Sequence, residues 1–78
     1  MKVIDNKPLD PWLRRRLADN VRQLRTEKKL SQESLSEDCG FHRTYISQVE
    51  RAVTNITLDN LQKIADALQV DPSKLLAA

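Results

Sequence analysis

Residues 30–51 read LSQESLSEDCGFHRTYISQVER, and this stretch decides the fold. Ser31 is typical of a helix N-cap, and Gly40 is the residue type that ends a helix in the left-handed conformation. A second helical pattern follows after only two residues, and we place it at Arg43–Arg51. Two short helices joined by so tight a glycine turn predict a helix-turn-helix unit.

The apolar residues of this unit share one inner face. Counted from Gln32, they are Leu35, Cys39, Phe41, Ile46 and Val49. We expect them to lock both helices onto a third helix and to leave the second helix of the unit with a polar outer face. At about 100° per residue, that outer face holds Thr44, Ser47, Gln48 and Arg51, while Arg43 projects from its N-terminal end.

An amphipathic helix is predicted before the unit, from about Pro11 to Lys28, with Asp10 as its N-cap. Its apolar stripe recurs every three or four residues and consists of Leu13, Leu17, Val21 and Leu24. Trp12 precedes the stripe and is expected to cover the core.

Further helices are predicted after the unit. Thr57 is expected to cap a helix, whose stripe is Leu58, Leu61, Ile64, Ala65 and Leu68. Asp71 and Pro72 repeat the pattern of a cap followed by proline and start a final turn or two. Residues 1–9 show no period and are expected to form a flexible arm. The sequence therefore predicts a compact, all-α domain of five helices over residues 10–78.

Composition excludes several classes of protein. A chain of 78 residues is one domain. Its single cysteine and single histidine exclude a disulfide scaffold and a metal cluster, so we expect no metal and no cofactor. No apolar run is long enough for a transmembrane helix or a secretory signal, so we expect a cytoplasmic protein with no membrane partner. Because no nucleophile and base are paired at a recognisable spacing, we do not expect an enzyme.

Positive charge is concentrated in the first third of the chain. Residues 1–29 carry nine Lys or Arg against four Asp or Glu, a net charge of +5, whereas residues 30–56 sum to −2 and residues 57–78 to −1. A basic segment suits an anionic partner, and a solvated helix face explains it equally well. We expect Arg14–Arg16 to form such a face or the edge of a dimer.

Four segments of the chain form a known pattern: Val21–Arg25, Leu30–Leu35, Gly40 with Arg43–Arg51, and Thr57–Val70. In this pattern the chain resembles the Cro/cI (Xre-type) helix-turn-helix regulators. The segment that starts at Arg43 is also similar to the controller proteins of restriction–modification systems and to small prophage repressors. The sequence departs from the family pattern at Ser36, where alanine is preferred, and at Ala52, where glycine is usual.

The resemblance implies a λ-repressor-like fold and a transcriptional regulator, a repressor or a controller, that recognises double-stranded DNA by sequence. Such a protein binds a palindromic operator as a homodimer. It acts by occupying a promoter or by touching RNA polymerase, which is a second candidate partner. Two alternatives with the same fold stay open: a protein-interaction module without DNA readout, and an antitoxin.

The outer face of the second helix carries side chains that suit the major groove. Arginine binds guanine, glutamine binds adenine, and threonine offers a hydroxyl or a methyl contact. We expect base contacts from His42, Arg43, Thr44, Ser47 and Gln48. For His42, capping of the helix is the alternative role.

The free N–H groups at the start of the unit suit a phosphate, and the resemblance implies phosphate contacts from Gln32 and from the residues after the second helix. The residues expected to touch phosphates are Ser31, Gln32, Tyr45, Arg51, Thr54, Asn55 and Thr57. Capping is an alternative or additional role for Ser31, Gln32 and Thr57. The ring of Tyr45 is expected to pack while its hydroxyl reaches a phosphate or a base edge.

Two further expectations concern structure and assembly. Glu50 shares the inward face of its helix, and a buried carboxylate must be paired. The resemblance implies Arg25 as its partner in a structural ion pair. Three apolar residues near the C-terminal end are expected to form a homodimer interface, with the N-terminal arm as an alternative interface: Val70, Leu75 and Leu76. The other interpretation is that Leu75 and Leu76 only close the core of the monomer.

Overall fold

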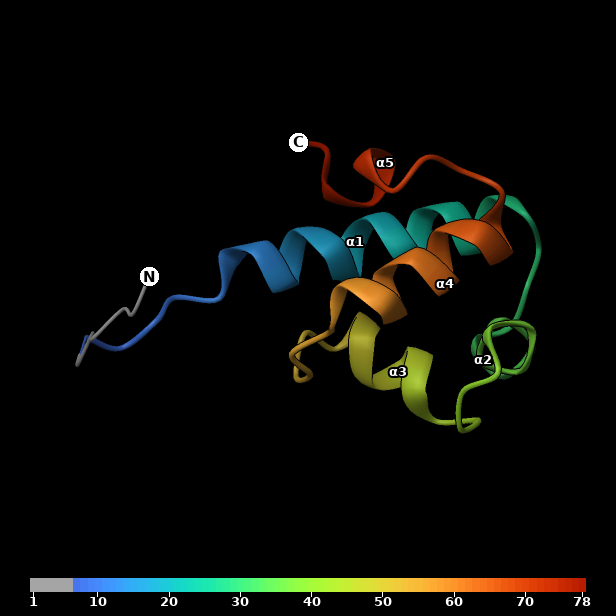
Figure 1. Cartoon of the computed structure of the whole chain (residues 1–78), viewed down its shortest axis with the longest axis horizontal. Coiled ribbons are helices and arrows are strands. Elements are labelled where there is room, and N and C mark those ends of the chain that lie inside the picture. The colour runs from blue at the N-terminus through green and yellow to red at the C-terminus, as the bar shows by residue number, and fades with distance from the viewer. Residues whose placement is uncertain (1–6) are drawn as a thin grey trace.

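The computed structural model describes residues 7–78, and over these residues the chain forms five α-helices and no strand. The helices are α1 (Trp12–Glu27), α2 (Gln32–Cys39), α3 (Tyr45–Glu50), α4 (Leu58–Leu68) and α5 (Ser73–Leu76). In Figure 1, α1 runs along the long axis beside α4, with α2 and α3 below them and α5 above. The predicted five-helix, all-α fold is confirmed. Of the expected arm, residues 1–6 lie outside the described residues, and residues 7–11 precede α1 without a helical turn.

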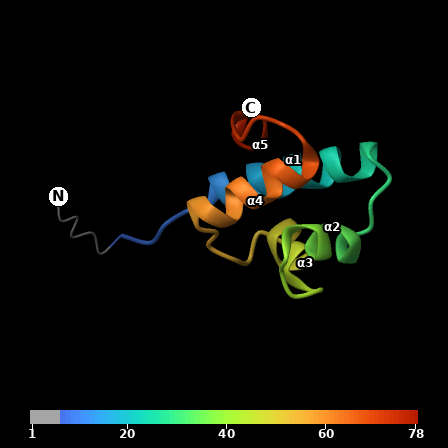
Figure 2. The same ribbon diagram turned by 45° about the vertical axis from the view of Figure 1, so that its right-hand side comes forward.

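The core lies where α1 packs against α3 and α5, and where α2 packs against α3 and α4. Figure 2 shows the same arrangement from a second side, with the α2–α3 pair below the long helix. The buried cluster consists of Leu17, Val21, Leu35, Cys39, Ile46, Val49, Leu61, Ile64, Ala65, Leu68 and Leu75. Four of the five predicted inner residues of the helix-turn-helix unit belong to it, and Phe41 packs against it while half-buried.

Local chemistry sets the ends of α2 and the start of α4 as the sequence predicts. The Oγ of Ser31 accepts the N–H of Ser34 at 2.9 Å, and the Oγ1 of Thr57 accepts the N–H of Asn60 at 3.1 Å. Gly40 ends α2 with a φ of +76°, in the left-handed region where a side chain is strained.

Two predicted helix starts are wrong. Pro11, not Asp10, occupies the N-cap position of α1, and no side chain caps it. The carboxylate of Asp10 instead binds Arg15, at 2.8 Å. The second helix of the unit, α3, starts at Tyr45, not at Arg43, because residues 43 and 44 form a turn. The first i to i−4 bond at this end runs from the N–H of Gln48 to the carbonyl of Thr44, at 3.2 Å.

Three residues expected in the apolar stripes or over the core are exposed instead. Leu13 is 44% exposed and Leu58 is 82% exposed. Both lie in the first turn of their helices. Trp12 is also about half exposed, and its ring lies under the guanidinium of Arg16, 5.0 Å from it. The helical period identifies the correct face but does not show where the core ends.

Helix α5 closes the monomer. Leu75 is fully buried and belongs to the core cluster. The Nδ2 of Asn20 on α1 donates to the carbonyl oxygens of Leu75 and Ala77, both at 2.9 Å, and so ties the C-terminal segment to α1. The side chain of Leu75 therefore has no surface to offer to a second copy, and its assignment to a dimer interface is wrong. Leu76 is half-buried.

Candidate nucleic-acid interface

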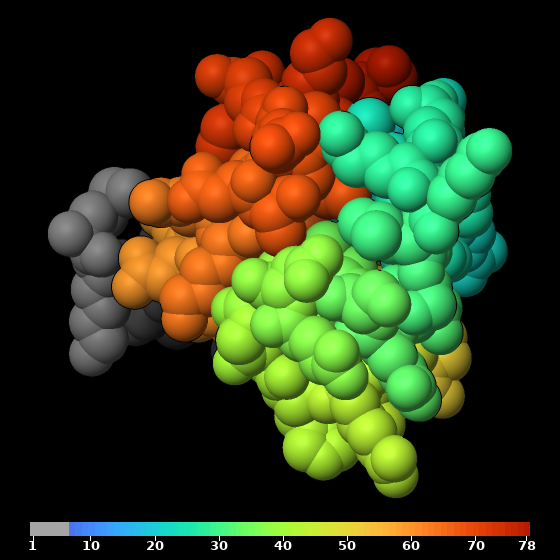
Figure 3. Space-filling model, turned by 90° about the vertical axis from the view of Figure 1, so that its right-hand side faces the viewer, coloured from blue at the N-terminus to red at the C-terminus, as the bar shows by residue number. Residues whose placement is uncertain are grey.

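The α2–α3 unit forms the projecting end of the molecule in Figure 3. Along the first part of α3 and the turn before it, the outward residues are Arg43, Thr44, Ser47 and Gln48, of which the first two are exposed and the last two half-buried. Ile46, Val49 and Glu50 are turned inward and buried. The one acidic residue of α3 therefore faces the protein, and the outward face carries no acidic side chain.

His42 makes its hydrogen bonds within the turn before α3. Its Nδ1 accepts the N–H of Thr44 at 3.3 Å and lies 2.9 Å from the Oγ1 of the same residue. Its carbonyl accepts the N–H of Tyr45 at 2.9 Å. The ring binds the N-cap residue Thr44 and makes no capping bond to α3 itself, and the base contact expected from this exposed residue stays a prediction.

A buried carboxylate fastens α3 to α1 and α2. Arg25 donates two hydrogen bonds to Glu50, from Nε at 2.6 Å and from Nη2 at 2.9 Å. Gln32 donates to the same carboxylate at 3.1 Å and Arg22 at 3.3 Å. Burial raises the pKa of Glu50, but the hydrogen bonds from Arg25, Gln32 and Arg22 outweigh it and hold the pKa below its usual value. The side chain is therefore ionised at neutral pH.

Sequence reasoning paired Glu50 with Arg25 and missed two members of this cluster. Arg22 lies three residues before Arg25, and this spacing puts both side chains on one face of α1. That spacing is the signal that could have found it. Gln32 was expected on a phosphate, and the structure shows its amide on Glu50 at the start of α2.

The residues that are expected to contact phosphates lie around α3. Ser31 and Thr57 make the capping bonds described above, and both stay exposed. The hydroxyl of Tyr45 accepts a hydrogen bond from Asn60 on α4 at 3.1 Å, and its ring packs 4.5 Å from that of Phe41. The remaining candidates follow α3: Arg51 and Asn55 are exposed, and Thr54 is half-buried.

Ala52 keeps the backbone that glycine would adopt. Its φ is +60°, and its N–H donates to the carbonyl of Val49 at 3.0 Å. The loop after α3 therefore turns in the left-handed conformation although its residue carries a Cβ. The Cβ of Ala52 therefore adds strain to this loop.

Cys39 is a buried apolar residue in this fold. Its thiol donates to the carbonyl of Lys63 at 3.6 Å. Burial, with a smaller effect of Asp38, raises the pKa of the thiol to about 11, so it is protonated at neutral pH. Residues 7–78 contain no group of three histidine, cysteine or acidic side chains that could hold a metal ion.

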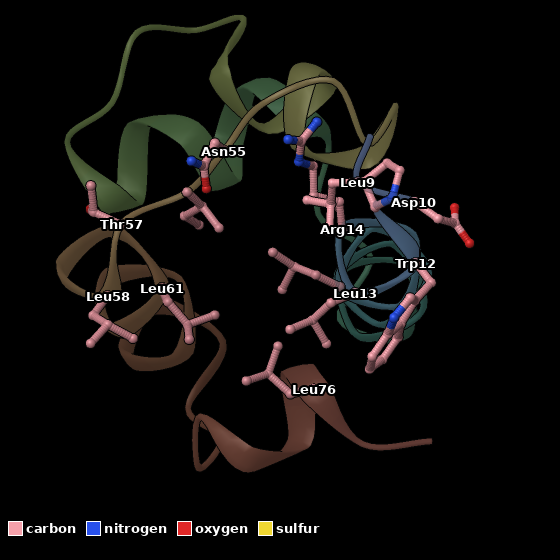
Figure 4. Close-up of a pocket in the computed structure, with 13 residues that line it drawn as sticks. Leu9, Asp10, Trp12, Leu13, Arg14, Asn55, Thr57, Leu58, Leu61 and Leu76 are labelled. Atoms are coloured by element: carbon pink, nitrogen blue, oxygen red, sulfur yellow. The ribbon is translucent and has the colours of Figure 1, made fainter. Parts of the chain in front are cut away.

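An apolar groove of about 430 Å³ lies beside the loop that follows α3. In Figure 4, Leu13, Leu61 and Leu76 point toward one another across it, from three different helices. Leu58 lies at one edge, and Asn55 and Thr57 come from the loop itself.

No helix within residues 7–78 is both long and apolar enough to cross a membrane.

Comparison with known proteins agrees with this geometry. Residues 21–75 match the helix-turn-helix family HTH_3. The control protein C.BamHI of Bacillus amyloliquefaciens is 53% identical over 57 residues, which cover 72% of this chain and 70% of that protein. Relatives of this chain are named as control proteins and transcriptional regulators.

Two solved structures are similar over most of their length. The hypothetical transcription factor NHTF from Neisseria aligns with a TM-score of 0.82 and 43% identity, over 96% of this chain and 87% of that one. The restriction-modification controller protein C.AhdI from Aeromonas hydrophila aligns with a TM-score of 0.77 and 40% identity, over 80% of this chain and 94% of that one. Sequence match, fold and the arrangement of α2 and α3 agree: the chain belongs to the Xre-type helix-turn-helix family.

Proposed function

We propose that the chain is a sequence-specific regulator of transcription, of the restriction–modification controller type, that binds a palindromic operator as a homodimer in the cytoplasm. Residues 10–78 form the DNA-binding domain. The observation that carries the proposal is the outward face of α3, which is polar and free of acidic side chains because its one carboxylate is buried and paired. An ordinary solvated helix face would not exclude acidic residues.

Each side chain on this face has a partner in the major groove. Arg43 fits guanine and Gln48 fits adenine, each through two hydrogen bonds. Thr44 and Ser47 offer hydroxyls to the edges of the bases. Arg43 and Thr44 lie at the projecting end, where a recognition helix enters the groove first. His42 supports this end through its hydrogen bond to the N–H of Thr44 and remains exposed.

Phosphate contacts would then flank the base contacts. The free N–H groups at the start of α2, beside Ser31 and Gln32, suit an anion. Tyr45 and Arg51 border the face of α3, and Thr54, Asn55 and Thr57 lie in the loop that follows. Such contacts fix the orientation of the protein on the duplex without reading its sequence.

A second copy supplies the rest of the affinity. One such module buries about 600–1,000 Å² against DNA, and two modules related by a two-fold axis read half-sites about 34 Å apart. Two copies on neighbouring half-sites must meet beside the DNA-binding face. The apolar groove lies there, because Asn55 and Thr57 belong both to its wall and to the proposed phosphate contacts.

We therefore propose that the homodimer forms through Leu13, Leu58 and Leu76 around this groove. Val70, half-buried in the turn before α5, stays a candidate interface residue outside this groove. Leu58 at the start of α4 supports this choice, because its large exposed apolar surface would gain free energy by being buried against a second copy. The dimer would regulate by occupying a promoter or by touching RNA polymerase.

Selection of bound sites from a random DNA pool tests the proposal. We expect enrichment of one palindromic sequence whose half-sites are about one helical turn apart. A protein-interaction module with this fold would enrich no sequence, and that result would contradict the proposal. An antitoxin that binds its own promoter would enrich a site, and co-purification of a toxin would then identify it.

A further inference from the structure

We propose that Ser36 is a positioning residue for base readout, because its buried hydroxyl holds the first turn of α3 in the orientation from which this helix reads DNA. The inference rests on the proposed function, since it assigns the geometry of the base contacts to a residue that touches no DNA.

Helix α3 cannot hold its own position. It has six residues, and isolated helices shorter than about 12–15 residues are marginal in water. Thr44 at its N-cap position has helical dihedral angles, and its side chain makes no capping bond to the helix. The orientation of α3 therefore depends on contacts from other elements.

Ser36 supplies such contacts at the N-terminal end of α3. Its Oγ accepts the N–H of Ile46 at 3.1 Å. Its carbonyl accepts the N–H of Phe41, the first residue of the turn, at 2.9 Å. One residue of α2 thus fastens both the entry of the turn and the first turn of α3. Ser36 and Ile46 are fully buried, so water does not replace the hydroxyl easily.

The other bonds near this end are of a different kind. His42 binds the N–H groups of Thr44 and Tyr45, and these bonds stay within the turn itself. Asn60 reaches Tyr45 only through the far end of the tyrosine side chain. The bond from Ser36 joins the backbone of α3 directly to a neighbouring helix.

The C-terminal end of α3 has a separate anchor. The Nη2 of Arg22 donates to the backbone carbonyl of Glu50 at 3.3 Å. Loss of the Ser36 hydroxyl would therefore loosen the backbone at one end of α3, although Ile46 stays packed in the core, and leave the other end held. Arg43 and Thr44 lie in the turn next to the loosened end, and their hydrogen bonds to bases depend on exact placement. Phosphate contacts from the loop after α3 depend less on this end.

Ser36→Ala tests the inference, with Ser34→Ala as the matched control. Both variants remove one hydroxyl from α2, but the hydroxyl of Ser34 contacts only Ser31, at 2.9 Å, on the exposed side. Alanine is a good helix former and is smaller than serine, so both variants should fold. An operator selected with the wild-type chain and a scrambled duplex serve as the two DNA probes.

We expect Ser36→Ala to lower the ratio of operator affinity to scrambled-DNA affinity by about 5-fold or more, the smallest discrimination expected from one base contact. Affinity for the scrambled duplex should stay the same. In the free protein, amide exchange should become faster at Ile46 by about 5-fold or more, relative to amides of α4 that report global opening. Ser34→Ala should change neither quantity.

An unchanged exchange rate at Ile46, or an unchanged affinity ratio, would overturn the inference. A Ser36→Ala chain that does not fold would also overturn it, because the hydroxyl would then serve the fold rather than the readout. If no operator can be selected with the wild-type chain, the proposed function fails instead. The exchange at Ile46 still reports the bond from Ser36 in that case.

Discussion

Replacing Glu50 with alanine should strongly destabilise the protein, because it leaves Arg25 without its carboxylate. The side chain of Arg25 is only 13% exposed, and it would keep a single neutral partner, the carbonyl of Leu30 at 2.8 Å. Removing one member of a buried ion pair costs about 3–5 kcal/mol. The bond to Leu30 keeps the expected loss near the lower limit, about 3 kcal/mol. A chain of this size has a stability of about 4–12 kcal/mol in total.

Urea denaturation followed by circular dichroism measures this loss, and Arg22→Ala is its control. The Arg22 side chain contacts the same carboxylate but is 55% exposed, so water can replace the contact and the expected loss is below about 1 kcal/mol. If Glu50→Ala unfolds at the wild-type urea concentration, the ion pair does not hold α1 and α3 together. If both variants lose the same amount, burial of Arg25 is not the cause.

Three further predictions concern strain, pH and assembly. Ala52→Gly should raise the free energy of unfolding by about 0.5–1 kcal/mol, because glycine adopts a φ of +60° without strain; an unchanged urea midpoint would refute this. Because folding lowers the pKa of Glu50, its carboxylate should stabilise the fold above the unfolded pKa of about 4.3, and this contribution should disappear as the pH falls through the lower folded pKa. The urea midpoints of the wild type and of Glu50→Gln should therefore converge in acid. Midpoints that stay equally far apart at every pH would contradict this prediction. Leu58→Glu should give a monomer in sedimentation experiments while Val53→Glu, an exposed apolar residue outside the groove, should stay dimeric; the opposite pattern would move the interface.

The parts of the fold that the sequence predicts are those set by neighbouring residues. Ser31, Gly40 and Thr57 act through bonds or dihedral angles within a few residues, and each lies where its type predicts a helix end. The inner face of the helix-turn-helix unit follows from helical period alone.

The parts that the sequence does not predict depend on contacts between distant elements. Helix α3 starts at Tyr45 rather than at Arg43, because residues 43 and 44 form part of the turn between α2 and α3. Leu58 shares the period of the α4 stripe but is exposed. The contacts of Gln32 with Glu50 and of Ser36 with Ile46 join residues 18 and 10 positions apart, and no local pattern encodes either of them.

The most direct test of DNA readout by α3 is the binding of Arg43→Ala to the selected operator and to a scrambled duplex at one salt concentration. Arg43 is exposed at the projecting end of the unit, so its removal should leave the fold intact. We predict a loss of about 1–3 kcal/mol on the operator, about 5- to 150-fold in affinity, with relaxed preference at one base position and a much smaller loss on the scrambled duplex. If Arg43→Ala binds both duplexes in the wild-type ratio, the outer face of α3 does not read the operator sequence through this residue.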